Sequence, residues 1–368
     1  MQINKIPLYL NHVKKEVFKQ LSLSTGLVLN KPQFIGIEVE DRCCLQCKHC
    51  DLWKISSRKK KLNLSQHKKL LVDLKSWLGS AEINFDGGEP FLNKNIMDLL
   101  VFADELGLKI NITTNGYLID DNKAEKIIKS NLNCLTVSLD SLKASVHDWL
   151  RGVNGTYDQV QNAITILNYL RKKHKSKMLL TINTVLLKQN FKEIIKMVHW
   201  VKNNGLDGIS FQPIDENFGK TCHQSQWFKE SGFWPEQKVV SRVIPELIKL
   251  KKTGYPIFNS VKHLKMIKDY FINPEGFWRA YPCRVGLSNF LVDLCGNVRL
   301  CYLMQSCGNI LNSSLGQIWN SEQANKQREL IKKCQKNCRL LLCNQKKLLS
   351  NYISTRFYKL INNLNGKI

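Results

Sequence analysis

Short apolar runs alternate with longer amphipathic segments between residues 34 and 214, and this alternation constrains the fold more than any other sequence feature. The apolar runs predict strands at 34–40, 82–85, 109–113, 134–139, 179–186 and 208–214. Helical spacing predicts helices at 64–79 (with Ser65 as N-cap), near 95–106, near 121–130, from Tyr157 onward and near 191–204. Strands separated by helices indicate an α/β fold of right-handed βαβ units, with a parallel sheet or open barrel.

Polar or glycine-containing segments follow most of the predicted strands. They are a cysteine cluster, DGGEP (86–90), TTNG (113–116), SLD (138–140) and Gln212-Pro213. The carboxyl ends of parallel strands meet at one edge, where α/β proteins build their sites. Each segment alone reads as a turn, but their joint placement predicts a ligand site. Gly87 and Gly88 would let the backbone approach that ligand closely.

The cysteine cluster spaces Cys43, Cys47 and Cys50 as C-x3-C-x2-C. A [4Fe–4S] cube normally takes four thiolates, so three leave one iron open to a small chelating molecule with an amine and a carboxylate. Zinc is the alternative and would need a fourth ligand, with Cys44 and His49 as the nearby candidates. No further C-x2-C pair lies outside this cluster, which favours the cube.

Composition narrows the setting of this chemistry. The first 26 residues carry charges where a signal peptide needs apolar residues, and no apolar run could span a bilayer, so we expect a cytoplasmic protein. Thirteen cysteines in a reducing compartment indicate metal binding rather than disulfides. The net charge of +25 fits either an anionic partner or a solvated lysine-rich surface. No nucleic-acid-binding motif accompanies that charge.

The cysteine motif with GGEP, TTNG, SLD and QP at successive strand ends resembles the radical S-adenosylmethionine (SAM) superfamily over about residues 34–214. The resemblance implies a partial (β/α)6 TIM-like barrel in which Cys43, Cys47 and Cys50 hold a SAM-binding [4Fe–4S] cluster. It implies SAM contacts at Gly87, Gly88, Glu89, Asn115, Ser138, Arg151 and Asn183. Glu89 would face the amine of SAM, Ser138 and Arg151 its carboxylate, and Asn183 its ribose. An ordinary surface role is the alternative for Arg151.

A second cysteine group begins at Cys283 and reaches Cys301 with the spacing C-x12-G-x4-C. It resembles the small cysteine-rich C-terminal SPASM/twitch domain of many radical SAM enzymes. The resemblance implies an auxiliary [4Fe–4S] cluster on Cys283, Cys301, Cys334 and Cys338, with Cys343 able to replace one of the last pair. A zinc knuckle and a second auxiliary cluster are the alternatives. Cys295 and Cys307 are expected to be packing thiols.

The predicted organisation is an N-terminal extension (1–33), the barrel (34–214), a connecting helical region (215–280), the SPASM/twitch-like domain (281–343) and a basic tail (344–368). The resemblance implies reductive SAM cleavage to a 5′-deoxyadenosyl radical, which abstracts hydrogen from an unidentified peptide or small-molecule substrate. The implied electron donor is a flavodoxin or ferredoxin. The alternatives are a non-catalytic iron–sulfur electron-transfer protein and an RNA-modifying radical SAM enzyme.

Overall fold

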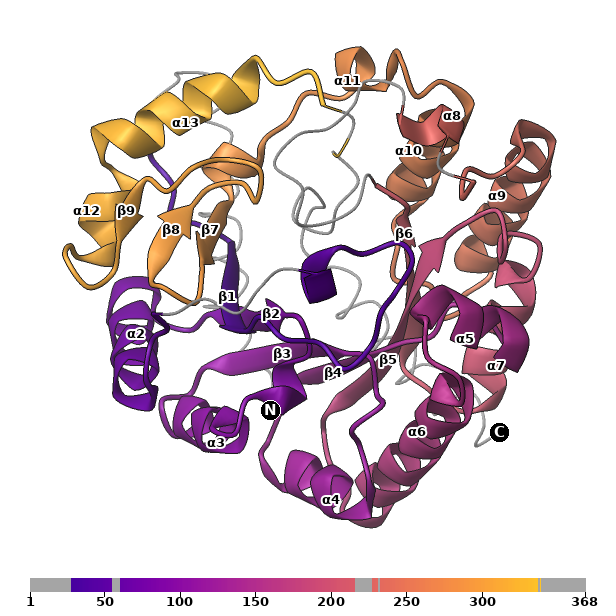
Figure 1. The fold of residues 1–368 in the computed structure, drawn as a ribbon, viewed down its shortest axis with the longest axis horizontal. Coiled ribbons are helices and arrows are strands. Elements are labelled where there is room, and N and C mark those ends of the chain that lie inside the picture. The colour runs from indigo at the N-terminus through magenta and orange to yellow at the C-terminus, as the bar shows by residue number, and fades with distance from the viewer. Residues whose placement is uncertain (1–27, 55–59, 216–226, 231, 337, 339–368) are drawn as a thin grey trace, which may run out of the picture.

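The structure is a computed structural model that describes residues 28–54, 60–215, 227–230, 232–336 and 338 (Figure 1). Four features predicted from the sequence lie wholly or partly outside these residues. They are most of the N-terminal extension, residues 216–226 of the connecting region, Cys343 and the basic tail.

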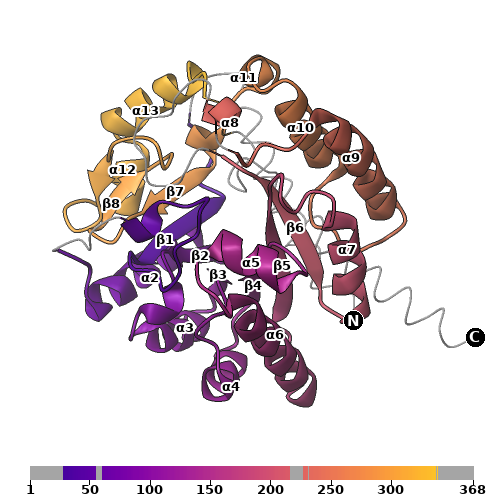
Figure 2. The same ribbon diagram turned by 45° about the vertical axis from the view of Figure 1, so that its right-hand side comes forward.

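All six predicted strands form, and they pair in parallel in the order of the chain. They are β1 (Phe34–Glu40), β2 (Glu82–Gly87), β3 (Lys109–Thr114), β4 (Cys134–Ser138), β5 (Leu179–Leu186) and β6 (Gly208–Pro213). The strands line the inside of an arc and the helices surround it in both views (Figures 1 and 2). The predicted α/β architecture of an open barrel is therefore confirmed.

The outer helices bury apolar faces against the strands. They are α2 (Leu64–Leu78), α3 (Ile96–Glu105), α4 (Asp121–Lys129), α6 (Thr156–Lys173) and α7 (Ile194–Asn203). In α2 the buried apolar residues are Leu70, Leu71 and Leu74, as the helical spacing predicts. Ser65 is not the N-cap of α2, because the helix already begins at Leu64. Asn63 caps it instead, in a reciprocal capping box with Gln66.

One helix of the barrel was not predicted from the sequence. Helix α5 (Ala144–Arg151) spans two turns after β4 and ends at Gly152, which adopts a left-handed conformation. Its buried residues are His147, Leu150 and Arg151, so two of the three are polar or charged. Apolar periodicity therefore could not reveal this helix.

In the described part of the connecting region, four helices lie between the barrel and the C-terminal part. They are α8 (Trp227–Glu230), α9 (Gln237–Lys252), α10 (Val261–Ile272) and α11 (Phe277–Ala280). The Trp234 ring lies 5.0 Å from Phe271 and 5.1 Å from Tyr270, between ring centroids. These bridge aromatics therefore pack with one another. Among the described residues, no helix is both long and apolar enough to cross a bilayer.

The C-terminal part shares the sheet of the barrel. Strand β7 (Asn289–Val292) pairs in parallel with β1, and β8 (Asn297–Arg299) and β9 (Gly308–Asn309) continue it as antiparallel neighbours. The result is a nine-stranded sheet in the order β6-β5-β4-β3-β2-β1-β7-β8-β9. Helices α12 (Leu315–Trp319) and α13 (Glu322–Lys332) extend the outer arc beyond α2 (Figure 1). The predicted cysteine-rich C-terminal domain (281–343) is thus joined to the edge of the barrel sheet.

The inner face of the barrel is polar. Ile35 and Ile37 of β1 belong to the apolar core, while the alternating positions carry Gly36 and Glu38. Farther along the sheet, the amide of Asn133, just before β4, donates to Asn111 of β3 at 2.7 Å, and the hydroxyls of Thr136 on β4 and Thr181 on β5 lie 2.9 Å apart. A polar lumen is suited to polar ligands rather than to a packed hydrocarbon core.

Candidate active site

The loop that carries Cys43, Cys47 and Cys50 leaves the end of β1 and is hydrogen-bonded to the GGEP loop. The backbone N–H of Gly88 donates to the Glu40 carbonyl and that of Glu89 to the Arg42 carbonyl, each at 2.8 Å. A Cβ atom at Gly87 would lie 1.9 Å from the Glu40 oxygen, and one at Gly88 would lie 2.2 Å from the Arg42 oxygen. Only glycine therefore permits this contact between the two loops.

The other side of the cysteine loop rests on the end of α5. The backbone N–H groups of Gln46 and Lys48 donate to the carbonyls of Arg151 and Leu150 at 3.1 and 2.9 Å. Gly152 has a φ of +73°, and a Cβ atom there would lie 2.3 Å from the Gln46 oxygen. The cysteine loop is therefore clamped between the GGEP loop and α5.

Glu89 ties three strand ends together. Its side chain is only 1% exposed, and it accepts hydrogen bonds from the Thr114 hydroxyl and the Asn115 backbone N–H at 2.8 Å and from the Phe91 N–H at 3.1 Å. Burial raises the pKa of Glu89, and these donors only partly offset that effect. The Asn115 amide also approaches the sulfur atoms of Cys44 and Cys43 at 3.4 and 3.7 Å. Glu89 and Asn115 thus connect the GGEP, TTNG and cysteine segments.

Arg151 is buried, which excludes the surface role considered for it. It is 7% exposed, its guanidinium lies 2.8 Å from the Asp140 carboxylate, and a second nitrogen lies 3.9 Å from the Cys47 sulfur. Burial opposes ionisation of Asp140, yet the nearby guanidinium holds the pKa of this carboxyl below its usual range. The Arg151 Nε atom has no hydrogen-bond partner in the described part of the chain. A positive charge with a spare donor therefore lies beside the cysteine loop.

The remaining predicted SAM contacts lie in one row across three strands. Ser138 of β4 is in register with Asn183 of β5, and Asn183 is in register with Ser210 of β6. The Ser210 hydroxyl donates to the Asn183 side-chain oxygen at 3.0 Å. Sequence reasoning identified two members of this row and missed Ser210, which alternation along β6 could have placed on the inner face.

The thiols of the first group fit an iron–sulfur cluster better than a single metal ion. In the described ranges, no three histidine, cysteine or carboxylate side chains lie close enough to hold one ion. A cube binds each thiolate at a different iron, so its ligands need not converge on one point. Burial raises the pKa of the Cys50 thiol to about 11, so the positive charge of bound iron would be needed to hold it as thiolate.

The structure also brings the predicted auxiliary ligands together. Burial raises the pKa of Cys301 to about 11, and the neighbouring thiols Cys283 and Cys334 add to the shift. The pKa of Cys338 is also raised, first by burial and then by the charges of Asp215 and of the thiols Cys301, Cys283 and Cys334. The four thiols thus lie near enough to one another for their charges to raise the pKa values of Cys301 and Cys338.

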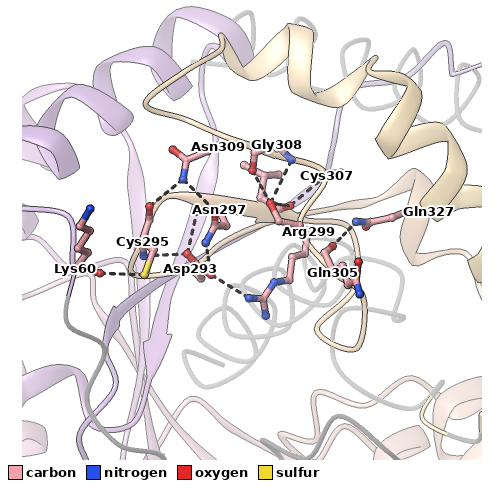
Figure 3. A network of polar contacts seen from close by, with 12 residues as sticks. Lys60, Asp293, Cys295, Asn297, Arg299, Gln305, Cys307, Gly308, Asn309 and Gln327 are labelled. Carbon is pink, nitrogen blue, oxygen red and sulfur yellow. Dashed lines mark hydrogen bonds and ion pairs between the residues drawn. The ribbon is translucent and has the colours of Figure 1, made fainter.

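Two further thiols of the C-terminal part are occupied by backbone contacts (Figure 3). Cys295 donates to the Lys60 carbonyl at 2.9 Å, and Cys307 is buried and donates to the Val298 carbonyl at 3.3 Å. Cys307 also belongs to the apolar core, and the packing role of Cys295 remains a prediction.

Comparison with known proteins identifies two regions of the chain. The family model of the radical SAM superfamily matches residues 37–201. The model of the SPASM iron–sulfur cluster-binding domain matches residues 283–344. The chain has a radical SAM domain and a SPASM domain. The predicted family, the enzyme class and the cofactors, SAM and [4Fe–4S] clusters, are therefore confirmed. The individual ligand residues remain predictions.

Similar proteins extend over most of this radical SAM chain. An AdoMet-dependent heme synthase of Oleidesulfovibrio alaskensis is 24% identical over 303 residues, covering 79% of this chain and 75% of that protein. The antilisterial bacteriocin subtilosin biosynthesis protein AlbA of Bacillus subtilis is 26% identical over 309 residues, covering 80% and 61%. The crystal structure of Streptococcus suis SuiB bound to precursor peptide SuiA has a TM-score of 0.62 at 20% identity, covering 90% and 77%. The SuiB likeness supports the fold.

Proposed function

We propose that this radical SAM enzyme modifies a peptide substrate by hydrogen abstraction. The observation that carries the reaction type is the clamped cysteine loop, in which three thiols lie between the GGEP loop and the buried Arg151–Asp140 pair. The likeness to SuiB, whose structure holds a precursor peptide, and to a bacteriocin biosynthesis protein supports a peptide as the substrate.

In this proposal the residues of the chain bind and orient the cofactors. Cys43, Cys47 and Cys50 hold the first cluster, and the spare donor of Arg151, with Ser138, receives the carboxylate of SAM. Gly87, Gly88 and Glu89 place backbone and carboxylate oxygens toward the amine. The cluster and SAM together supply a 5′-deoxyadenosyl radical that takes hydrogen from the substrate.

The auxiliary cluster is proposed to bind Cys283, Cys301, Cys334 and Cys338, with Cys343 as a substitute ligand. A flavodoxin or ferredoxin is proposed as the electron donor. The cytoplasmic location expected from the N-terminal residues and the lack of a bilayer-spanning apolar run remains a prediction.

A step in heme synthesis is the second candidate. It is favoured by the heme synthase relative, of which this chain covers 75%. The net charge of +25 would suit a substrate with carboxylate groups.

The first experiment replaces Cys43, Cys47 and Cys50 together by alanine. The variant should lose all 5′-deoxyadenosine formation and fall from about eight to about four irons per chain, because only the auxiliary cube would remain. Cys44→Ala is the matched control and should retain both. Loss of iron and SAM cleavage in the control would instead make Cys44 a fourth ligand.

The second experiment identifies the substrate class. Reduced enzyme and SAM are incubated with a deuterated cell extract, and deuterium in 5′-deoxyadenosine is measured by mass spectrometry. Protease treatment of the extract should remove the deuterium transfer if the substrate is a peptide. Transfer that survives the protease would favour the small-molecule candidate.

A further inference from the structure

Asp140, the last residue of the SLD segment, is held through both its backbone and its carboxylate. The carboxylate accepts the Val185 backbone N–H at 3.0 Å and lies 2.8 Å from the Arg151 guanidinium. The backbone carbonyl accepts the side-chain amide of Asn190 at 2.8 Å, and the backbone N–H donates to Nδ1 of His147 at 3.2 Å. Asp140 is fully buried, so these contacts form out of reach of bulk water. Four groups therefore fix the place of this carboxylate.

Two of these four groups come from one face of α5. His147 and Arg151 lie four positions apart in the helix, which places their side chains on the same side of it. His147 holds the backbone of Asp140, and Arg151 pairs with its carboxylate. Helix α5 therefore binds a single residue of the segment after β4 at two points.

The hydrogen bond from Asp140 also defines the form of the His147 ring. A backbone N–H can only donate, so Nδ1 carries a lone pair and the ring proton lies on Nε2. Burial, together with the nearby Arg151 charge, lowers the pKa of His147 to about 4, which agrees with a neutral ring. The Nε2 atom has no hydrogen-bond partner in the described part of the chain. The contact of this ring with Asp140 is thus made through the acceptor at Nδ1.

The orientation of Arg151 depends on the place of Asp140. A planar guanidinium that pairs with a carboxylate is oriented by that carboxylate. One terminal nitrogen of Arg151 lies 3.9 Å from the Cys47 sulfur, and Nε is the donor without a partner among the described residues. A shift of Asp140 would therefore turn this donor away from the place proposed for the carboxylate of SAM.

We propose that His147 is a positioning residue for SAM, which holds the Asp140 backbone so that Arg151 presents its spare donor to the carboxylate of SAM. The inference rests on the proposed function, which assigns that carboxylate to Arg151. The His147 side chain is fully buried and does not itself reach SAM. Its effect passes through Asp140 and Arg151.

The test compares His147→Asn with His147→Leu. An asparagine carries its side-chain oxygen as many bonds from Cα as Nδ1 is, whereas a leucine has a methyl group there. Both variants remove the same part of the ring. His147→Leu should bind SAM about tenfold more weakly than the parent, because the buried Asp140 N–H loses its acceptor. His147→Asn should bind SAM within about threefold of the parent. Equilibrium dialysis with labelled SAM measures both affinities.

His67→Leu is the matched control. His67 of α2 is also buried, its Nδ1 lies 3.0 Å from the Asn63 carbonyl, and its Nε2 also lacks a partner in the described ranges. No ligand role is proposed for either residue. His67→Leu should therefore leave SAM affinity and iron content as in the parent. A loss of SAM affinity equal to that of His147→Leu would overturn the proposal, because any buried histidine would then have the same effect.

Kinetics and NMR give two further readouts. In His147→Leu the SAM concentration that half-saturates 5′-deoxyadenosine formation should rise, while the rate at saturating SAM and the iron content stay near those of the parent. In the ¹⁵N spectrum of the histidine-labelled parent, the His147 ring should carry its proton on Nε2. Parent-like SAM affinity in His147→Leu, equal losses in His147→Leu and His147→Asn, or a proton on Nδ1 would each overturn the positioning role.

Failure of the proposed function would give a different pattern. A parent protein that binds SAM and forms no 5′-deoxyadenosine would refute the proposed function, and the comparison of SAM affinities would still test His147. Formation of 5′-deoxyadenosine by the parent, with parent-like SAM affinity in His147→Leu, would remove the positioning role and leave the function standing.

Discussion

At the scale of single residues, the pair of Arg151 and Asp140 is the most consequential in the barrel mouth. Both side chains are buried, and the pair lies beside the Cys47 sulfur. An ion pair removed from water loses its compensation when either partner is deleted. A second buried pair, Arg171 with Asp207, joins α6 to the segment before β6, at residues with no proposed ligand role.

The two pairs make a matched test. Arg151→Ala should lower the free energy of unfolding by about 3–5 kcal/mol and should also weaken SAM binding, because the charge proposed to receive the carboxylate is lost. Arg171→Ala should destabilise the protein by a similar amount and leave SAM affinity unchanged. Urea denaturation and equilibrium dialysis with labelled SAM measure the two effects. Equal loss of SAM affinity in both variants would reduce Arg151 to a structural role.

Asp86 should make stability depend on pH. Its pKa is about 7 in the folded protein and 3.8 as the ordinary value, so the folded state holds the proton more tightly. The free energy of unfolding contributed by this group should therefore fall as pH rises from about 4 to about 7. Asp86→Asn should remove this fall and be more stable than the parent at pH 8, by a few kcal/mol at most. A parallel pH profile in parent and variant would contradict the assignment.

Side-chain contacts could be predicted from the sequence only where the residues belong to a recognisable motif. Glu89 and Asn115 were identified because the GGEP and TTNG segments that contain them resemble the radical SAM pattern. The hydrogen bond between Asp86 and Tyr302 was not, because it depends on how β7, β8 and the loop after β8 pack beside β1. Asp140 lay in the quoted SLD segment, but its pairing with Arg151 needs the direction of α5.

At the scale of elements, the strands were predicted well because each places buried Ile, Val, Leu or Phe residues at alternating positions. Helix α5 was missed because its buried face carries His147 and Arg151. Its function is nonetheless clear from its end, where the Arg151 and Leu150 carbonyls accept the backbone of the cysteine loop.

Two glycines near this end of α5 allow the cost of a left-handed backbone to be measured separately from the cost of a steric clash with the cysteine loop. Gly152 and Gly155 have φ of +73° and +77°, but only at Gly152 would a Cβ atom meet a neighbour, the Gln46 oxygen. Gly155→Ala should cost about 1–2 kcal/mol from the left-handed backbone alone. Gly152→Ala should cost more and also displace the cysteine loop, lowering the iron content of the first cluster. Iron analysis and denaturation distinguish the two, and equal iron loss in both would count against the clamp.

At the scale of the whole molecule, the SPASM domain continues the wall of the barrel. Residues Phe34 to Ile37 pair with Asn289 to Val292, so one strand edge belongs to both domains. Trp319 seals this junction from the outside. It packs near Trp77 and Phe290, and its indole N–H donates to the Asn30 carbonyl at 3.0 Å.

Trp319→Ala should therefore weaken both domains together. We expect a loss of about 3–5 kcal/mol, as for a large aromatic removed from a core. Leu330→Ala changes an apolar residue that is 58% exposed and should have little effect. Denaturation followed separately by barrel and SPASM probes should show both transitions shifting. A shift confined to the SPASM probe would mean that the domains unfold independently.

The pairing of β1 with β7 also decides how such a protein can be recombined. A chimera that takes residues 281–338 from another SPASM protein would have to reproduce the register from Phe34↔Asn289 to Ile37↔Val292. A one-residue slip would turn every side chain of β7 to the opposite face. It would carry Tyr302 away from Asp86. Successful exchanges should therefore transfer β1 together with the SPASM domain. The segment that must be exchanged as one piece then includes a strand of the barrel.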